Sequence, residues 1–347
     1  GTLARIDRVE IGEKIGEGAF GAVFKGTWSG TAVALKQLTA ATEDVVAEFE
    51  REAAMLSQLH HPNVVRFLGV HGDGAQRYLV LEYVGLGSLL ALLRGRRAEL
   101  GAVAQLELAE SACKGMVFLS ERQVLHRDLS ARNVLVARVD GRYESKVSDF
   151  GLSRAAGGAE YYRSSTAQIP VRWSAPEVIE YGEHSSAADV WSFGVVLWEI
   201  GTFGRVPYSW LSTKDVALEV PRGERLPEPD GCVAGLWEIM RECWEKDARA
   251  RPSFANLLAR LSRVQELVRE EAGLDADDSD PGADTPPRLS SRSVNAGVYH
   301  SVQRAGSASS AERDGAAVQT VPSNEYLSTP NISTQPSTEA AVRAARS

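Results

Sequence analysis

The stretch HRDLSARN, residues 126–133, decides how the rest of this sequence is interpreted. Three apolar residues follow it at 134–136, and two tripeptides come later, DFG at 149–151 and APE at 175–177. Any one of these short motifs could occur by chance. Their occurrence together, in this order and at these spacings, is not plausibly chance. They therefore predict one defined site.

A glycine-rich stretch, GEGAFGAV at residues 16–23, lies near the N-terminus. The GxGxxG pattern alone is weak, and in a dinucleotide-binding fold a helix should follow it. Here a strand follows instead, which disfavours that fold. Between two strands, Gly16, Gly18 and Gly21 would let backbone amides approach phosphates closely. An ordinary glycine-rich hairpin is the alternative.

The next strand carries VALK at residues 33–36, which places the cation of Lys36 within reach of phosphates under the glycine-rich stretch. A helix is predicted over residues 43–59, because apolar residues recur there at a spacing of three to four. Glu52 falls on that apolar face, where a carboxylate needs a partner. We therefore expect Glu52 to pair with Lys36, although a solvated strand position is the commoner role for a single lysine.

The periodicity divides the chain into a strand-rich part and a helical part. Strands are predicted at residues 8–15, 22–27, 32–38 and 77–83. Helices are predicted at residues 105–119, 189–200, 236–244 and 254–268. The helix at 189–200 is apolar on nearly every face, which indicates the core of a large lobe. A small β-rich lobe followed by a larger helical lobe predicts a ligand site between them.

Composition changes near residue 270. All seven tryptophans lie before that point, and from Arg269 onward the chain has no Trp, Phe, Cys or Lys. A segment of this kind buries too little apolar surface to offset its chain entropy. We therefore predict a lead-in at 1–7, a folded domain at 8–268 and a disordered Ser/Thr/Ala-rich tail at 269–347.

Composition also excludes several classes of protein. The chain is 44% hydrophobic and 24% charged, as in an ordinary globular domain. A net charge of −8 disfavours nucleic acid as a partner, and no apolar run approaches the ~18 residues of a membrane segment. The three cysteines show no CxxC spacing, which favours a reducing compartment. Because the chain starts at Gly1 rather than Met, we expect it to be part of a longer protein.

The complete motif set resembles that of the eukaryotic protein kinases, and within them the protein tyrosine kinase family, over about residues 8–268. The resemblance implies an α+β, bilobal fold. A small β-rich N-lobe with one key helix would span about 8–84, and a larger α-helical C-lobe about 85–268. It also implies ATP as the phosphate donor and Mg²⁺ as the metal, with Mn²⁺ as an alternative.

The resemblance assigns roles to particular residues. Asp128 would accept or orient the proton of the attacking hydroxyl, with Arg132 as the compensating cation beside it. Lys36, paired with Glu52, would bind the α- and β-phosphates, and Asn133 and Asp149 would hold the metal ions. The residues implied around the nucleotide are Gly16, Gly18, Gly21, Val23, Ala34, Leu81, Glu82, Val84 and Leu135.

Other positions resemble structural supports of that family. Asp189 is expected to anchor the backbone around residues 126 and 127, and Glu177 to pair with Arg251. An apolar spine between the lobes is implied at Leu56, Phe67, His126 and Phe150.

Two features favour tyrosine as the acceptor. Ser130 stands two residues after Asp128, where serine/threonine kinases usually have lysine, and Arg132 is the compensating cation. Pro170, in a PVRW segment, resembles the tyrosine kinase platform for a long, flat phenol. A serine/threonine or dual-specificity kinase of the tyrosine-kinase-like group is the alternative. A pseudokinase scaffold is a further alternative, but it predicts loss of a catalytic residue, and none is lost.

Four tyrosines outside the motifs are candidate sites of regulation and of partner binding. Tyr161, 12 residues after Asp149, stands at the spacing of the autophosphorylated tyrosine in similar kinases, and Tyr162 follows it. A tyrosine pair without a role is the alternative. Phosphorylation of one molecule by another would imply transient self-association. Tyr299 and Tyr326 in the tail are candidate docking phosphosites for SH2- or PTB-type modules, and an inert linker with two chance tyrosines is the alternative. The expected substrates are proteins with acceptor tyrosines. The expected location is the cytoplasm, as a free kinase or as the intracellular part of a membrane receptor.

Overall fold

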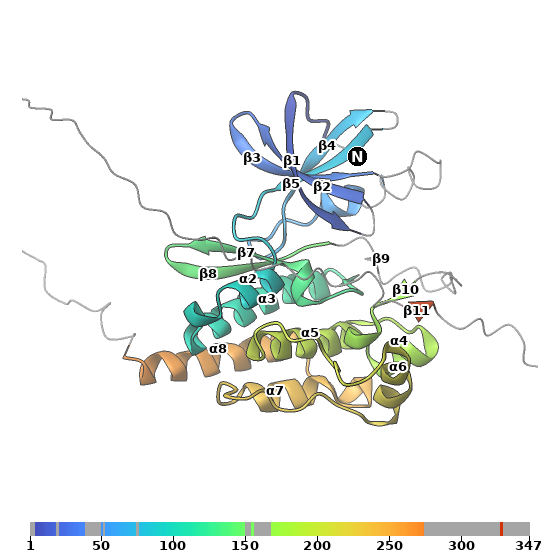
Figure 1. The fold of residues 1–347 in the computed structure, drawn as a ribbon, viewed down its shortest axis with the longest axis vertical. Helices are drawn as coiled ribbons and strands as arrows, with labels where there is room; N and C mark the ends of the chain where they lie inside the picture. The colour runs from blue at the N-terminus through green and yellow to red at the C-terminus, as the bar shows by residue number, and fades with distance from the viewer. Residues whose placement is uncertain are drawn as a thin grey trace, which may run out of the picture.

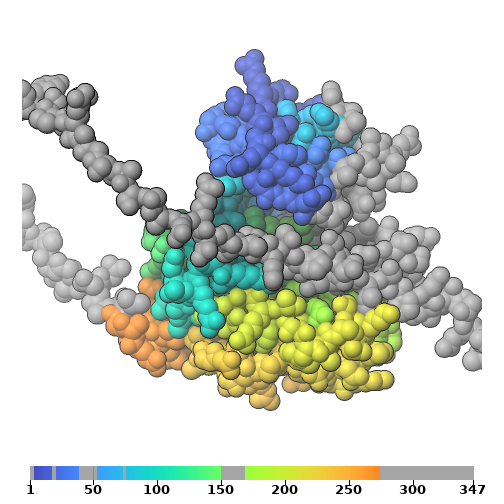
Figure 2. Space-filling model, viewed as in Figure 1, coloured from blue at the N-terminus to red at the C-terminus, as the bar shows by residue number. Residues whose placement is uncertain are grey.

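The computed structural model describes residues 4–18, 21–38, 50, 53–73, 76–149, 154–155, 168–273 and 327–328. These residues form two lobes. The strands of the first lobe are blue to cyan in Figure 1, and the helices of the second are cyan to orange. In Figure 2 the blue residues of the first lobe lie above the yellow and orange residues of the second. The predicted α+β bilobal architecture is confirmed.

The N-lobe is built on a five-stranded antiparallel sheet in the order β1-β2-β3-β5-β4. Its strands are β1 (Val9–Gly18), β2 (Gly21–Trp28), β3 (Thr31–Gln37), β4 (Phe67–Asp73) and β5 (Gln76–Glu82). All four strands predicted from the sequence are present. Ser29 and Gly30 close the β2–β3 hairpin with φ values of +48° and +80°. Positive φ at both turn residues matches the right-handed twist of the flanking strands.

One face of strand β3 lies in the small core of the N-lobe, and the other face carries Lys36. Val33 and Leu35 are fully buried and pack with Tyr78 and Val80 of β5. Because side chains alternate across a strand, Ala34 and Lys36 lie on the opposite face of the sheet. This alternation presents Lys36 to the C-lobe.

The helix predicted over residues 43–59 is described only in part. Residues 53–56 are helical, and Glu52 lies outside the described residues. The predicted end at Leu59 is wrong. The N–H groups of Gln58 and Leu59 bond to Met55 and Leu56, three residues back, at 3.1 Å each. This tighter pattern ends the α-helix before Leu59.

The C-lobe is mainly helical. Its α-helices within the described residues are α2 (Leu89–Gly95), α3 (Ala102–Glu121), α4 (Pro176–Tyr181), α5 (Ser186–Gly201), α6 (Thr213–Arg222), α7 (Leu236–Cys243) and α8 (Phe254–Glu271). The four predicted helices are present as α3, α5, α7 and α8. Helix α8 ends at Glu271 rather than at residue 268, so the residues predicted as tail begin inside this helix.

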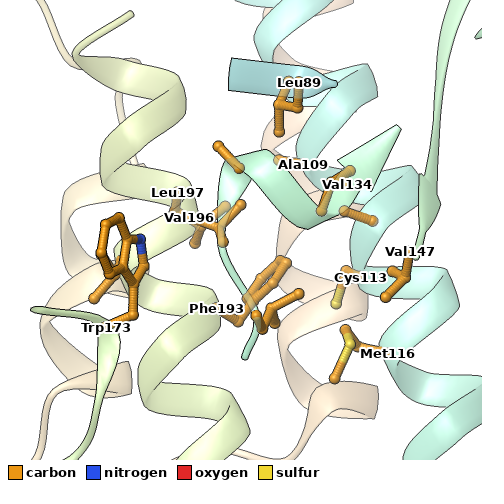
Figure 3. Close-up of a cluster of buried hydrophobic side chains, with 14 of the residues drawn as sticks. Leu89, Ala109, Cys113, Met116, Val134, Val147, Trp173, Phe193, Val196 and Leu197 are labelled. Carbon is orange, nitrogen blue, oxygen red and sulfur yellow. The ribbon is translucent and has the colours of Figure 1, made fainter. Parts of the chain in front are cut away.

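Helix α5 forms the centre of the C-lobe. Every residue from Ala188 to Gly201 is buried, as its apolar sequence predicts. Ser185 caps its N-terminus by accepting a hydrogen bond from the N–H of Ala188 at 3.1 Å. Figure 3 shows Phe193 pointing from α5 toward Cys113 and Met116 of α3.

Short strands and 3₁₀ turns complete the C-lobe. A hairpin of β7 (Val134–Val139) and β8 (Arg142–Val147) follows the 3₁₀ turn η2 (Ala131–Asn133), and a second turn, η3 (Val171–Trp173), precedes α4. Strand β6 (Val124–Leu125) pairs with β9 (Arg154–Ala155). Strand β10 (Gln168–Ile169) pairs with β11 (Leu327–Ser328), which lies in the segment predicted as tail.

Candidate active site

The two lobes meet at an ion pair between Lys36 and Asp149. The Lys36 ammonium on β3 lies 3.1 Å from a carboxylate oxygen of Asp149, which follows β8 and is 113 residues away in sequence. Asp149 has a φ of +60°, a conformation that costs a non-glycine residue energy and is commonest at functional sites. Glu52, the expected partner of Lys36, lies outside the described residues.

The glycines of the GxGxxG stretch lie on β1 and β2, and β2 is the neighbour of β3, which carries Lys36. Gly16 pairs with Val23, and Gly18 pairs with Gly21, in the β1–β2 ladder. Val23 pairs in turn with Lys36 in the β2–β3 ladder. Residues 19–20, between β1 and β2 in the sequence, lie outside the described residues. The arrangement is a glycine-rich hairpin beside a lysine, and it does not open a helix.

The residues predicted to contact a nucleotide base come together from both lobes. Ala34 on β3 pairs with Leu81 on β5. The segment that leaves β5 through Val84 then runs along β7, where Ser88 forms a bridge with Leu135. The N–H of Leu86 donates to the carbonyl of Val136 at 3.0 Å. This pairing joins the lobes and brings Val84 and Leu135 into one region with the N-lobe strands.

The side chain of Glu82 is occupied within the protein. Its carboxylate accepts a hydrogen bond from the N–H of Arg66 at 2.8 Å and lies 3.2 Å from the ammonium of Lys146. A nucleotide contact at this position would therefore use the backbone carbonyl of Glu82, in line with the expectation of a backbone contact.

Asp128 lies in a network of short hydrogen bonds. One carboxylate oxygen accepts from the guanidinium of Arg132 at 2.7 Å. The other accepts from the side-chain amide of Asn133 at 2.9 Å, and the same amide donates to the Asp128 carbonyl at 2.7 Å. These contacts follow from the 3₁₀ turn η2, which returns Arg132 and Asn133 toward Asp128 within five residues. Burial raises the pKa of Asp128, and the nearby charges of Arg132 and His126 oppose that increase.

The backbone around Asp128 is held by Asp189, as expected. The two carboxylate oxygens of Asp189 accept from the N–H groups of His126 at 2.8 Å and Arg127 at 3.0 Å. Arg127 has a φ of +68°, so this anchor stabilises an unfavourable backbone conformation. The ring of His126 donates from Nε2 to the carbonyl of Ser148 at 3.0 Å and accepts at Nδ1 from the N–H of Asp128 at 3.3 Å.

The expected pair of Glu177 and Arg251 is also present and is bidentate. The two distances are 2.7 and 2.8 Å, and the Arg251 side chain is fully buried. Arg251 also donates to the carbonyls of Glu245 and Ala187, both at 2.9 Å. This contact connects the start of α4 to the residues before α8, so its role is structural.

Sequence reasoning missed Glu199, which joins the core to this site. Its carboxylate is 1% exposed and accepts from the N–H of Ala131 at 2.8 Å and from the indole N–H of Trp173 at 3.0 Å. The guanidinium of Arg132 lies over the Trp173 ring, 4.7 Å from its centroid. Burial raises the pKa of Glu199 from 4.5 to about 7. The available signal was a carboxylate inside the otherwise apolar run of α5.

The predicted phosphosites Tyr161, Tyr162, Tyr299 and Tyr326 lie outside the described residues, as does Phe150 of the predicted spine. The described members of that spine are buried. Leu56, Phe67 and His126 have exposed fractions of 4%, 7% and 0%.

The sequence matches a family model described as protein tyrosine and serine/threonine kinase over residues 9–261. This match covers more than half of the chain, so the chain belongs to that family. The bilobal fold, with a β-sheet N-lobe and a helical C-lobe, is that of a protein kinase domain.

Three curated relatives illustrate the similarity. Megakaryocyte-associated tyrosine-protein kinase of Mus musculus is 39% identical over 295 residues, covering 83% of this chain and 56% of that protein. Tyrosine-protein kinase csk-1 of Caenorhabditis elegans is 37% identical over 269 residues, covering 77% of this chain and 49% of that protein. Ephrin type-A receptor 8 of Rattus norvegicus is 41% identical over 265 residues, covering 74% of this chain and 70% of that protein. The chain spans about half the length of the first two.

No helix among the described residues is long and apolar enough to span a membrane.

Proposed function

We propose that the protein containing this domain is a tyrosine kinase that transfers the γ-phosphate of ATP to tyrosine hydroxyls of proteins. The observation that carries the proposal is the path from Asp128 through Arg132 to Trp173. Through Arg132 it links the proposed catalytic carboxylate to the segment after Pro170. Relatives that share this region at 37–40% identity include proteins named as tyrosine-protein kinases.

In the proposed reaction, Asp128 acts on the acceptor hydroxyl. Arg132 and Asn133 hold its two carboxylate oxygens, so one orientation is favoured before the substrate arrives. Burial raises the pKa of Asp128, which makes its carboxylate a better proton acceptor. The acceptor oxygen forms a bond to the γ-phosphorus as the bond to the β,γ-bridging oxygen breaks, and ADP leaves. Asp128 receives or orients the released proton.

Lys36 and the glycine-rich hairpin would hold the phosphates. Lys36 is an ammonium whose side chain is 12% exposed, so its charge acts at short range with little screening. Gly16, Gly18 and Gly21 have no Cβ, which allows the backbone to approach phosphate oxygens. Val23, Ala34, Leu81, Val84 and Leu135 would enclose the adenine, with the backbone of Glu82 and Val84 at its edge.

Asn133 and Asp149 fit a divalent metal. Both offer hard oxygen donors of the kind that Mg²⁺ and Mn²⁺ accept, and phosphate oxygens and water would supply the other ligands. The Asn133 amide nitrogen donates to Asp128, which orients the amide. A metal bound there would neutralise charge on the phosphate oxygens. Lys36 and Asp149 contact each other at 3.1 Å, which supports a role for both groups at the same phosphates.

Phosphorylation of Tyr161 or Tyr162 is the proposed means of activation. A phosphate there would bring negative charge to the basic residue Arg127, which precedes Asp128, and order the intervening segment. Tyr299 and Tyr326, once phosphorylated, would serve as docking sites for SH2- or PTB-type modules. The proposed folded domain is residues 8–268 with the end of α8 added, acting in the cytoplasm as a free kinase or as part of a receptor.

The test is phosphorylation of an equimolar mixture of tyrosine and serine peptides by the purified chain with Mg-ATP. We expect phosphate on the tyrosine peptide. The matched variant Asp128→Asn should bind ATP with unchanged affinity and lose about 10²–10⁴ in kcat, the usual contribution of a general base. Phosphate on the serine peptide alone would overturn the choice of acceptor. A fully active Asp128→Asn would overturn the assignment of Asp128.

A further inference from the structure

A short segment before β1 pairs with β4, which lies at the edge of the N-lobe sheet. Arg5 forms a parallel bridge with Val70 of β4. The N–H of Ile6 donates to the carbonyl of Val70 at 2.8 Å, and the N–H of Val70 donates to the carbonyl of Ala4 at 2.9 Å. Residues 4–6, which we call the lead-in strand, therefore act as a sixth strand of this sheet.

The lead-in strand is packed against the sheet as well as paired with it. Ile6 is 5% exposed and belongs to the small N-lobe core that also contains Leu35 of β3. The ring of His71 on β4 donates from Nδ1 to the carbonyl of Ile6 at 2.8 Å. Gly69 leaves room for the strand, because a Cβ there would lie 2.5 Å from the carbonyl oxygen of Ala4. The N-lobe core is therefore incomplete without the lead-in strand.

The residue that the lead-in strand binds lies in the same row of the sheet as Lys36. Val70 lies opposite Leu79 of β5, and Leu79 lies opposite Lys36 of β3. The row continues through Val23 of β2 to Gly16 of β1. Residues that lie opposite each other in neighbouring strands share one face of the sheet and contact each other. A continuous row of cross-strand pairs thus connects the lead-in strand to the lysine and the first glycine of the proposed phosphate site.

The position of β3 determines where the ammonium of Lys36 lies. That ammonium is 3.1 Å from the carboxylate of Asp149, so a small shift of the strand changes a short contact between charges. Leu35, the neighbour of Lys36 in sequence, is fully buried in the core that Ile6 completes. Because protein cores are close-packed, loss of Ile6 from this core forces the strands around it to adjust. Release of the lead-in strand should therefore move Lys36.

We propose that the lead-in strand controls ATP binding. Docked on β4, it holds β3 so that Lys36 is positioned for the phosphates, and its release weakens the binding of ATP. The inference rests on the proposed role of Lys36 in ATP binding and does not depend on the choice of acceptor. Coupling between two sites is reciprocal, so ATP must favour the docked strand by the same factor by which the docked strand favours ATP. Residues 4–6 are thus a positioning element of the domain.

The first experiment measures the Kd of the full chain for Mg-ATP by calorimetry, together with the KM values for ATP and for a tyrosine peptide. Ile6→Ser removes the apolar side chain that anchors the lead-in strand. It should raise the Kd and the KM for ATP at least about fivefold, the lower end of the usual coupling between two sites, and leave the peptide KM unchanged. Ile6→Val keeps an apolar side chain and should bind ATP like the wild type.

Ile11→Ser is the matched control. Ile11 is an isoleucine of the same sheet, on β1, and it is 44% exposed. The same substitution there removes no core contact and should leave the Kd for ATP unchanged.

Hydrogen exchange of the wild-type chain tests the same coupling without any substitution, and it remains decisive if Ile6→Ser does not fold. Exchange of the Val70 N–H requires its bond to the carbonyl of Ala4 to open. Because the coupling is reciprocal, saturating Mg-ATP should slow this exchange at least about fivefold. The N–H of Gly273, at the end of α8, is the control amide and should exchange at the same rate with and without ATP.

The possible results separate this inference from the proposed function. Equal Kd values for Ile6→Ser and Ile11→Ser, or exchange at Val70 that ATP does not change, would overturn the inference. A smaller fraction of active protein with wild-type KM values for ATP and peptide would show that the strand only stabilises the fold, which also overturns it. If the wild type phosphorylates no tyrosine peptide while Ile6→Ser still weakens ATP binding, the proposed acceptor is wrong and the inference stands. A wild type that does not bind ATP would overturn both.

Discussion

Glu199 accepts a hydrogen bond from the indole nitrogen of Trp173 at 3.0 Å, from within the core of the C-lobe. The same carboxylate oxygen accepts from the N–H of Ala131 at 2.8 Å. One buried side chain on α5 therefore holds both the turn after Asp128 and the segment that follows Pro170. Together with the contact of Arg132 and Trp173, these two hydrogen bonds fix the turn after Asp128 relative to the segment after Pro170.

Removing the charge of Glu199 should change how stability depends on pH. Burial raises its pKa from 4.5 to about 7, so the folded protein keeps this proton over a range in which the unfolded chain loses it. The free energy of unfolding should therefore fall as pH rises from about 4.5 to about 7. The loss is on the order of 3 kcal/mol for a shift of this size. Glu199→Gln does not titrate and should lack this loss.

Urea denaturation of both proteins at pH 5 and pH 8 measures the effect. All other titrating groups are shared, so the difference between the two proteins isolates Glu199. We expect the wild type to lose stability relative to Glu199→Gln between these two values. A difference that is the same at both pH values would show that Glu199 does not titrate in this range.

Breaking the pair between Glu177 and Arg251 should be strongly destabilising. Glu177→Ala leaves the guanidinium of Arg251 buried without its carboxylate, and removal of one partner from a buried pair typically costs about 3–5 kcal/mol. Arg249→Ala, in an exposed pair with Asp247, is the control and should change stability within the error of the measurement. Equal melting temperatures for Glu177→Ala and wild type would contradict the structural role of the pair.

Gly194 is required by the close approach of α5 and α7. A Cβ at this position would lie 2.6 Å from the Cβ of Cys243 and 2.7 Å from the indole nitrogen of Trp244. Gly194→Ala should therefore destabilise the domain by about 1–3 kcal/mol, the usual cost of overpacking a core. Gly95→Ala, where a Cβ would meet no atom within 4 Å, should leave stability unchanged or increase it. Thermal unfolding measures the stability of both variants. An equal loss of stability in the two would contradict the packing argument.

Replacing Ser130 by alanine should stabilise the domain. The Ser130 side chain is fully buried, and its hydroxyl has no hydrogen-bond partner in the part of the chain that the structure describes. A buried hydroxyl without a partner costs about 1–3 kcal/mol, which Ser130→Ala would recover in part. Ser148→Ala is the control, because that buried hydroxyl donates to the carbonyl of Asn133 at 2.8 Å and its loss should destabilise. A lower melting temperature for Ser130→Ala than for wild type would show that its hydroxyl is satisfied.

Motif spacing predicted the local parts of the site well. The contacts of Asp128 with Arg132 and Asn133 lie within one turn of chain, so the order of residues largely determines them. The helix ends predicted from the sequence were less accurate. Helix α8 continues to Glu271 because its ladder extends past the last apolar position, with the N–H of Ala272 bonded to the carbonyl of Val268 at 3.1 Å.

The sequence by itself determined the family, the two lobes and the identity of most candidate site residues, because these depend on residue types at fixed spacings along the chain. Only the tertiary structure decided which distant groups meet. Lys36 contacts Asp149 across 113 residues, Glu199 binds Trp173 from the core, and Leu327 pairs with Ile169. Burial and hydrogen bonding between remote segments set these contacts and the pKa of Glu199, and no local pattern encodes where a chain folds back on itself.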